Sequence, residues 1–200
     1  MDLAVVALTF AAIFVVELPD KTFIAALVLS TRYRPLLVWL GVGLAFFLQT
    51  LIAVTAGQLA TLLPETVIRA VAAGIFLVGA VLLFRAAPHA DREEKETEDE
   101  YAAKASDPKT GLKAVGASFL VLFAAEWGDL SQLLTVSLVA RYHEAVSVFL
   151  GAWAALLAVS GLAVLAGRFL LRYMRLSVLH YIGATVCLVL AGVTLYELLS

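Results

Sequence analysis

The sequence predicts an all-α membrane protein with six transmembrane helices arranged as two inverted three-helix repeats. Three observations predict this fold class. Apolar residues make up 62% of the 200 residues, charged residues only 15%, and the mean hydropathy of +0.98 is too high for a soluble domain. Apolar stretches of membrane-spanning length recur six times, and the two halves of the chain share a pattern of polar residues.

Each apolar stretch is long enough to cross roughly 30 Å of hydrocarbon. The six spans are expected at residues 3–30, 36–63, 66–85, 113–140, 145–171 and 176–199. The first stretch follows Asp2 instead of a basic segment and is longer than the apolar core of a signal peptide, so we expect a membrane helix there. Cys187 is the only cysteine, so no disulfide can form within the chain.

A polar stretch separates the third and fourth spans. It divides the chain into repeat one (1–85), an acidic cytoplasmic linker (86–112) and repeat two (113–200). The mixed charges of the linker favour a solvated segment that is partly helical or disordered, and a metal-sensing role is the alternative. The net charge of −2 provides no basic surface for nucleic acid, so we expect no nucleic-acid partner.

The basic residues predict the orientation in the membrane. Arg69 and Arg141 are the only Lys or Arg residues at one set of span ends, whereas eleven lie at the other: Arg32, Arg34, Arg85, Arg92, Lys95, Lys104, Lys109, Lys113, Arg168, Arg172 and Arg175. Cytoplasmic loops carry the excess of Lys and Arg, so both termini are expected outside and the linker in the cytoplasm. We expect an integral protein of the plasma membrane.

The two halves match when one is shifted by 109 residues. Glu17 then falls on Glu126, Asp20 on Asp129, Thr22 on Ser131, Arg32 on Arg141 and Gly74 on Gly183. Because three spans is an odd number, the second half must cross the membrane in the opposite sense. Inverted repeats of this kind are typical of secondary transporters.

The matched carboxylates are the candidate site. Glu17 and Asp20 lie near the middle of the first span, and Glu126 and Asp129 near the middle of the fourth. An ionisable group at that depth costs roughly 3 to 17 kcal/mol, so such groups face a bundle interior and mark a transport path. A Glu and an Asp three residues apart are expected on one face of a helix, where both can reach one ion.

Neighbouring residues add candidate ligands. Thr22 and Ser131 supply hydroxyl oxygens, and Pro19 and Gly128 are expected to loosen the helices. Backbone carbonyls freed there are further candidate ligands, with a simple kink or a close helix contact as the alternative. Six other glycines are expected where helices pack closely: Gly41, Gly43, Gly57, Gly151, Gly161 and Gly167.

The ligand chemistry indicates a hard cation. Neither motif contains Cys, Met or His, and oxygen ligands alone suit Mg2+, Ca2+ and Mn2+. Crowded carboxylates in a poorly solvated site are expected to hold protons when no cation is bound and to release them when one binds. We therefore expect transported cations and protons as substrates, no permanent cofactor and no enzyme activity.

Lys21, Gln49 and the three histidines each allow two functional interpretations. Lys21 is either a structural ion pair for Glu17, four residues before it, or a functional counter-charge. Gln49, deep in the second span, either bonds across helices or completes the cation shell. The histidines at 89, 143 and 180 lie in a loop or near span ends, where solvated or interfacial roles are expected rather than a proton relay.

At the two motifs the chain resembles the family of manganese and calcium exchangers that includes Golgi transmembrane protein 165 and its yeast Gdt relative. That family carries the motif E-x-G-D-(K/R)-(S/T) once in each half. The resemblance covers essentially the whole chain and implies cation/proton antiport. The functional positions that it implies are Glu17, Asp20, Glu126 and Asp129, with Thr22, Ser131 and Gln132 as helpers.

This sequence departs from the motif at two positions. Pro19 replaces Gly, and Leu130 replaces the second basic residue, which leaves the site more negative. The expected function is export of Mn2+ or, second, Ca2+ in exchange for protons. The alternatives are an exporter of small organic solutes and an intramembrane aspartyl protease, which also places two carboxylates in helices.

Overall fold

The computed structural model describes residues 1–18, 20–104, 110–173 and 176–199. All of the regular structure in these residues is helical: α1 (Leu3–Glu17), α2 (Lys21–Arg32), α3 (Pro35–Ala60), α4 (Glu65–Ala86), α5 (Ala90–Lys104), α6 (Leu112–Ala125), α7 (Leu130–Tyr142), α8 (Ala145–Tyr173) and α9 (Leu176–Leu199). The expectation for Pro19 lies outside the described residues, and so do those for the surroundings of Gly167. The prediction of an all-α protein is confirmed.

Residues at the helix ends explain where several helices begin. Asp2 caps α1, because its carboxylate accepts hydrogen bonds from the backbone N–H groups of Ala4 and Val5. Pro35 occupies the first turn of α3, where its missing N–H costs no helical hydrogen bond. His143 adopts a left-handed conformation, with φ of 56°, where α7 ends.

Four helices are each long and apolar enough to cross a membrane: α3, α4, α8 and α9. The remaining candidate spans are bent pairs, α1 with α2 at 71° and α6 with α7 at 73°. Counted as one span each, the pairs bring the total to six within the described residues, which agrees with the predicted number. The first and fourth spans, however, are broken helices rather than continuous ones.

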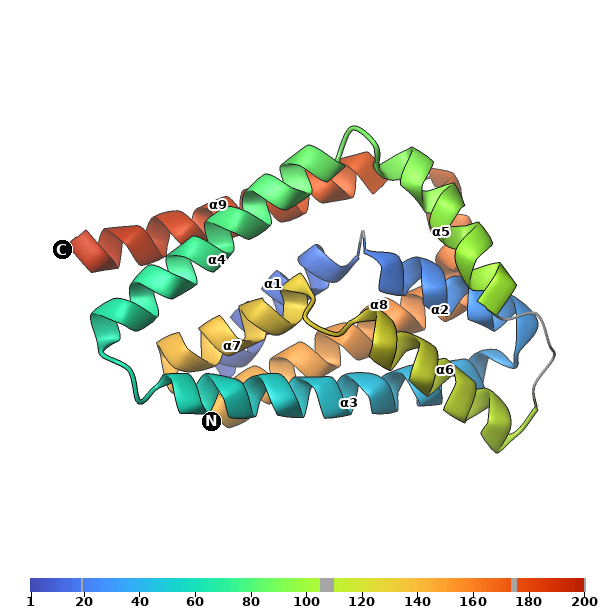
Figure 1. Ribbon diagram of the computed structural model, residues 1–200, viewed down its shortest axis with the longest axis horizontal. Helices are drawn as coiled ribbons and strands as arrows, with labels where there is room; N and C mark the ends of the chain where they lie inside the picture. Colours follow the sequence, from blue (N-terminus) through green and yellow to red (C-terminus); the bar gives the residue numbers. More distant parts are fainter. Residues whose placement is uncertain (19, 105–109, 174–175, 200) are drawn as a thin grey trace.

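The two halves run in opposite directions through the molecule. In Figure 1, α1 and α2 lead from left to right, whereas their counterparts α6 and α7 lead from right to left. The same reversal relates α3 to α8 and α4 to α9. Both termini lie at one end, here called the termini end, and α5 lies at the other, here called the α5 end. This is the inverted-repeat arrangement predicted from the odd number of spans per half.

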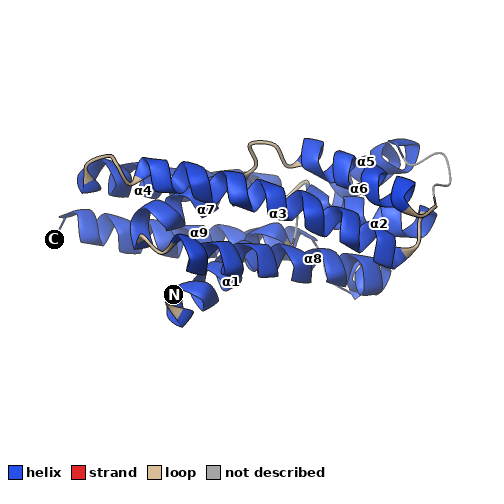
Figure 2. Ribbon diagram, turned by 90° about the horizontal axis from the view of Figure 1, so that it is seen from below, coloured by secondary structure: helices blue, strands red, loops and turns tan. Residues whose placement is uncertain are grey.

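Helices of the two repeats interleave. The side view shows α3 and α4 in one layer and α8 and α9 in the other, and in this view all four helices run roughly along the long axis of the molecule (Figure 2). Across the layers α3 packs on α8 and α4 on α9, while α1 packs on α8 and α6 on α3. Each contact therefore joins one repeat to the other, and the broken helices are held in the centre.

Small residues permit the closest of these contacts. A Cβ atom at Gly41 of α3 would collide with the carbonyl oxygen of Val115 in α6, and one at Gly151 of α8 would collide with that of Val6 in α1. Val6 and Val115 are 109 residues apart and the two glycines 110 apart, so the two contacts lie at nearly equivalent positions of the two repeats. This confirms the close-packing interpretation of Gly41 and Gly151.

Large apolar side chains cover the outside of the bundle. On α3 and α4 the exposed ones include Leu40, Leu44, Leu51, Val78 and Leu82. A soluble protein rarely exposes so extensive an apolar surface, but lipid chains solvate it well. Several polar residues of the spans are buried instead, among them Glu17, Thr22, Gln49 and Glu126.

Candidate functional site

The first break lies between α1 and α2. Glu17 is the last residue of α1, and Asp20 is the N-cap of α2. The backbone N–H of Asp20 donates a hydrogen bond of 3.0 Å to the carbonyl oxygen of Glu17, and Asp20 in turn accepts one from the N–H of Phe23. A tight turn therefore keeps the two acidic residues side by side although the helix is interrupted.

The second break, between α6 and α7, repeats this turn. The N–H of Asp129 donates to the carbonyl oxygen of Glu126 at 3.3 Å. Gly128 has φ of +80°, a left-handed conformation that glycine adopts without steric cost. The side chain of Gln132 closes the turn by accepting a hydrogen bond of 3.1 Å from the N–H of Gly128.

These breaks correct one step of the sequence reasoning. Glu17 with Asp20, and Glu126 with Asp129, do not share one face of a continuous helix. Each Glu ends a helix and each Asp begins the next, and the turn between them brings the pair together. The expectation that Gly128 loosens the helix is confirmed, because its left-handed conformation is incompatible with a continuing helix.

The structure brings all four carboxylates to one point. One carboxylate oxygen from each of Glu17, Asp20, Glu126 and Asp129 can be chosen so that all four lie within 4.8 Å of one another. Glu17 is 0% exposed and Glu126 is 2% exposed, whereas the two aspartates are half-buried. Four negative charges this close repel one another strongly away from bulk water, so the cluster needs a cation or protons as counter-charge.

Hydroxyl groups complete the lining. Thr22, which is buried, donates a hydrogen bond of 2.6 Å from its Oγ1 to Oε1 of Glu17. Ser131 is also buried, and its backbone N–H donates to the carboxylate of Asp129. The second Glu17 oxygen, Oε2, is buried without a hydrogen-bond partner among the described residues. An unpartnered buried carboxylate oxygen is unfavourable by itself and is a ligand available to a cation.

The two glutamines bond to the chain at the second break. The Nε2 of Gln49 in α3 donates a hydrogen bond of 2.9 Å to the carbonyl oxygen of Phe123, near the end of α6. An interhelical hydrogen bond was one of the two roles considered for Gln49. Its acceptor is one of the last carbonyl oxygens of α6, which have no hydrogen-bond partner within the helix. Gln132 was also expected to help bind the ion, but its amide oxygen is the atom that accepts from Gly128.

Lys21 is placed differently from its predicted pairing with Glu17. Lys21 begins α2 while Glu17 ends α1, so the break removes the helical spacing that would bring them together. None of the ion pairs given by the described residues involves Lys21, and its side chain is exposed. It lines two cavities that α5 borders, one with Glu93 and one with Glu100 and Tyr101.

Sequence reasoning missed the contribution of α5. This acidic helix packs against α2 and α9 at the α5 end, with Ala90 and Tyr101 buried. Burial raises the pKa of the Tyr101 phenol to about 12, with the charges of Glu126, Glu100 and Asp20 adding to the rise. The electrostatic field of the site therefore extends to α5. The sequence does contain a signal for a helix packed on one face here, because Ala90, Thr97 and Tyr101 recur with helical spacing.

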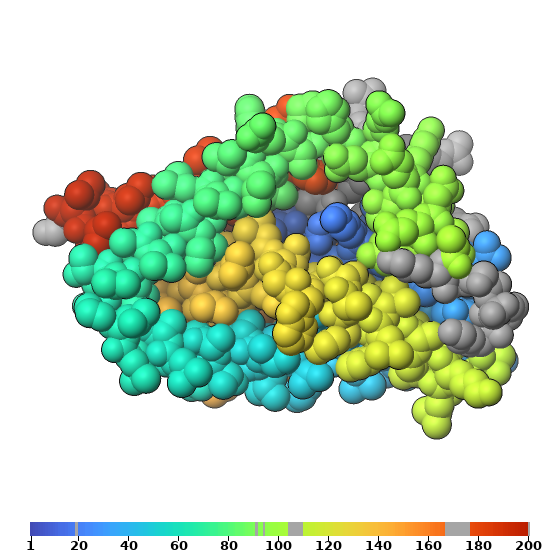
Figure 3. Space-filling model, viewed as in Figure 1, coloured from blue at the N-terminus to red at the C-terminus, as the bar shows by residue number. Residues whose placement is uncertain are grey.

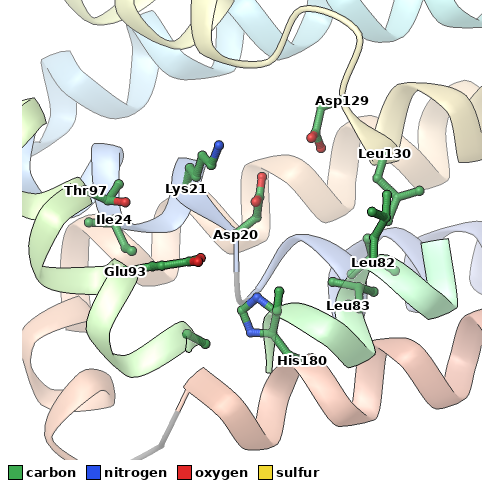
Figure 4. A pocket seen from close by; sticks show the side chains of 13 residues that line it. Asp20, Lys21, Ile24, Leu82, Leu83, Glu93, Thr97, Asp129, Leu130 and His180 are labelled. Carbon is green, nitrogen blue, oxygen red and sulfur yellow. The ribbon is translucent and has the colours of Figure 1, made fainter. Parts of the chain in front are cut away.

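The open side of the site is a cavity between α5 and the breaks. It is lined by Asp20 and Asp129 together with side chains of α4, α5 and α9, among them Glu93, Thr97 and His180 (Figure 4). In the space-filling view the molecule is hollowed between the green α4–α5 region and the yellow α6–α7 region, with blue atoms from the N-terminal part of the chain visible inside (Figure 3). His180, for which a solvated or interfacial role was expected, lines this cavity.

The inverted repeats and the central carboxylate cluster define an integral membrane protein with the architecture typical of secondary transporters. The chain belongs to the divalent cation/proton antiporter GDT1 family, whose model matches residues 5–91 and 114–200. The two matched segments coincide with the two repeats. The resemblance seen at the motifs is thereby confirmed.

Individual relatives agree with this assignment. The chain is 32% identical to the Arabidopsis thaliana protein PAM71-homolog, chloroplastic, over 94% of this chain and 58% of that protein. It is 31% identical to protein PAM71, chloroplastic, of the same plant over 96% and 56%. The GDT1-like protein sll0615 of Synechocystis is 36% identical over 78% of this chain and 80% of its own length. The chain thus spans a little over half the length of the two chloroplastic proteins. No solved structure matches it significantly.

Proposed function

We propose that the protein exchanges a divalent cation for protons at the four-carboxylate cluster, with Mn2+ as the first candidate and Ca2+ as the second. The observation that carries this proposal is the meeting of Glu17, Asp20, Glu126 and Asp129 within 4.8 Å. Each repeat supplies one buried and one half-buried carboxylate, so the cation sits between the two halves that move against each other.

The ligand set supports a hard cation. All of the acidic ligands are carboxylates, and the hydroxyl groups of Thr22 and Ser131 are buried beside them. The C-termini of α1 and α6 and the N-termini of α2 and α7 all meet at the breaks, so the helix dipoles largely offset one another and the carboxylates supply the negative charge. Oxygen ligands of this kind suit Mn2+, Ca2+ and Mg2+ better than softer metals.

Proton exchange follows from the charge of the same cluster. Without a cation the four carboxylates are too close to remain fully ionised, and protons supply the missing positive charge. A divalent cation that binds replaces those protons. The cluster therefore holds either substrate but not both, which couples the two fluxes.

The proposed direction of transport is export of the cation, driven by protons that enter the cell, and the proposed orientation says at which end of the molecule each substrate enters. The basic residues concentrate at the α5 end, which we assign to the cytoplasm, and the termini end to the outside. The cation then enters at the α5 end and the protons at the termini end. The location in the plasma membrane stays a prediction from the sequence. The orientation can be tested by introducing a single cysteine near either terminus of the protein and measuring whether it is labelled from outside intact cells.

The test is cation flux in reconstituted vesicles under an imposed pH gradient. Wild-type protein is expected to move Mn2+, and more slowly Ca2+, in the direction opposite to the proton flux. Glu17→Gln and Asp129→Asn are each expected to abolish this cation flux. Glu96→Gln is the matched control, because Glu96 is exposed on α5 and pairs with Arg92. Absence of flux in the wild type, or full flux in both site variants, would refute the proposal.

A further inference from the structure

The cavity at the α5 end has a volume of about 200 Å3 and reaches the transport carboxylates directly. Its polar lining comes from three sources. Asp20, Lys21 and Asp129 lie at the breaks, Glu93 and Thr97 belong to α5, and His180 belongs to α9. In Figure 4, the Glu93 side chain extends from α5 toward Asp20, and Lys21 lies on the same side of the cavity.

The position of Glu93 is set by the packing of α5. Ala90 and Tyr101, at 3% and 4% exposure, fix one face of this helix against the bundle. Glu93 and Thr97 lie between them along the helix and project into the cavity. Glu93 is exposed, as are Glu96 and Glu98, but Glu96 and Glu98 line neither of the two cavities that Lys21 lines.

Lys21 creates an electrostatic problem at this opening. Its side chain lines the cavity together with Asp20, so its ammonium group repels a divalent cation that enters from the α5 end. Repulsion at an opening lowers the rate of cation capture, and a carboxylate across the cavity offsets it. Glu93 is placed to do so.

We propose that Glu93 is a cation-capture residue, which offsets the charge of Lys21 and guides a divalent cation from the α5 end to Asp20 and Asp129. This inference rests on the proposed function, since it concerns access to the same cluster. Glu93 acts before the cation reaches the four-carboxylate cluster and is not one of its ligands there. It therefore governs the cation concentration needed for transport and not the maximal rate.

The experiment measures initial Mn2+ flux, with the cation supplied from the side that carries α5. In Glu93→Gln the KM for Mn2+ is expected to rise about threefold to tenfold with an unchanged maximal rate, and the difference is expected to shrink as salt screens the charges. Glu98→Gln makes the same substitution on the same helix away from the cavity and is expected to leave the KM unchanged. Lys21→Met added to Glu93→Gln is expected to return the KM toward the wild-type value.

Three results would overturn this inference. They are an unchanged KM in Glu93→Gln, an equal rise in Glu98→Gln, or a rise that Lys21→Met does not reverse. A wild-type protein that moves no cation refutes the proposed function instead, so the two failures are distinct.

As a second readout, Mn2+ is expected to slow thiol labelling of Thr97→Cys in a Cys187→Ala background, and to do so less effectively when Glu93→Gln is added.

Discussion

The hydroxyl of Thr22 donates a hydrogen bond of 2.6 Å to the Glu17 carboxylate across the break between α1 and α2. It orients one oxygen of Glu17, while the other lacks a hydrogen-bond partner among the described residues. Thr22→Val keeps the shape of the side chain and removes the donor. Because hydrogen bonds to charged groups contribute about 1.5 to 3 kcal/mol, we expect the KM for Mn2+ to rise about tenfold or more.

Thr22→Ser is the control for this prediction. It retains the hydroxyl and is expected to keep the KM within about twofold of the wild-type value. Flux measurements over a range of Mn2+ concentrations distinguish the two variants. Equal KM values for the Val and Ser variants would show that the hydroxyl does not position Glu17.

Gly128 is expected to be required for its left-handed conformation. Its φ is +80°, and a Cβ atom there would meet no other atom within 4 Å, so Gly128→Ala adds strain without a clash. We expect a loss of about 1 to 2 kcal/mol in stability, seen as a lower melting temperature in detergent. Gly128→Asn should lose less, since Asn tolerates this conformation better.

Gly116 provides the matched control for Gly128. It lies inside helix α6, and an added Cβ atom would again meet nothing within 4 Å. Gly116→Ala should therefore leave the melting temperature unchanged or raise it, because Ala favours a helix by about 1 kcal/mol. Equal effects at both positions would contradict the role assigned to Gly128.

Gly41 and Gly151 are expected to respond alike to substitution. An added Cβ atom at either would collide with a backbone carbonyl of the facing helix, which cannot rotate away. We expect Gly41→Ala and Gly151→Ala each to cost about 1 to 3 kcal/mol of stability, measured by thermal unfolding. Gly74→Ala, where nothing lies within 4 Å, should be harmless, and a difference between the two repeats would argue against equivalent contacts.

Arg141 joins three parts of the chain at the termini end. It donates hydrogen bonds to Thr194 and, at 2.8 Å, to Glu197, whose carbonyl oxygen also accepts from Arg69 of α4. The Arg141 side chain is 8% exposed, and Arg141→Met removes the hydrogen bonds that it donates to the buried Thr194 hydroxyl and to the partly exposed Glu197 carboxylate. We expect a loss of about 1 to 2 kcal/mol, reduced by the partial exposure of Glu197. Arg92→Met breaks an exposed pair on α5 and should change the melting temperature little.

Cation binding should stabilise the folded protein. A ligand at one hundred times its Kd adds about 2.7 kcal/mol, so Mn2+ or Ca2+ is expected to raise the melting temperature and a chelator to reverse the rise. Glu126→Gln removes a proposed ligand whose side chain is buried, at 2% exposure, and should abolish the shift. An equal shift with sodium at matched ionic strength would point to a general salt effect instead.

The sequence was sufficient for the large features of the fold. Apolar length predicts the six spans, since hydrocarbon thickness sets a minimum number of residues. The shift that pairs Glu17 with Glu126 predicts the repeat, and the odd number of spans makes it inverted. The motifs also predicted which four carboxylates meet, because unpaired acids at that depth are too costly to face lipid.

Local spacing was a poorer guide to how the acids meet. Glu17 and Asp20 are three residues apart, as two neighbours on a helix would be, yet a turn between helices joins them. The same break separates Lys21 from Glu17 and places it beside α5. Nothing in the linker composition alone shows that Glu93 faces the carboxylates, because that depends on how α5 packs against α2 and α9.

By itself, the sequence determined the membrane environment, the inverted repeat and the four acids, because each depends on composition or on a periodic pattern along the chain. Only the tertiary structure decided the helix breaks, the bonds of Gln49 and Gln132, and the cavity that Glu93 shares with Asp20. These features depend on which atoms of distant segments come within a few ångströms. Packing between the two repeats sets those distances, and no pattern within a single segment records them.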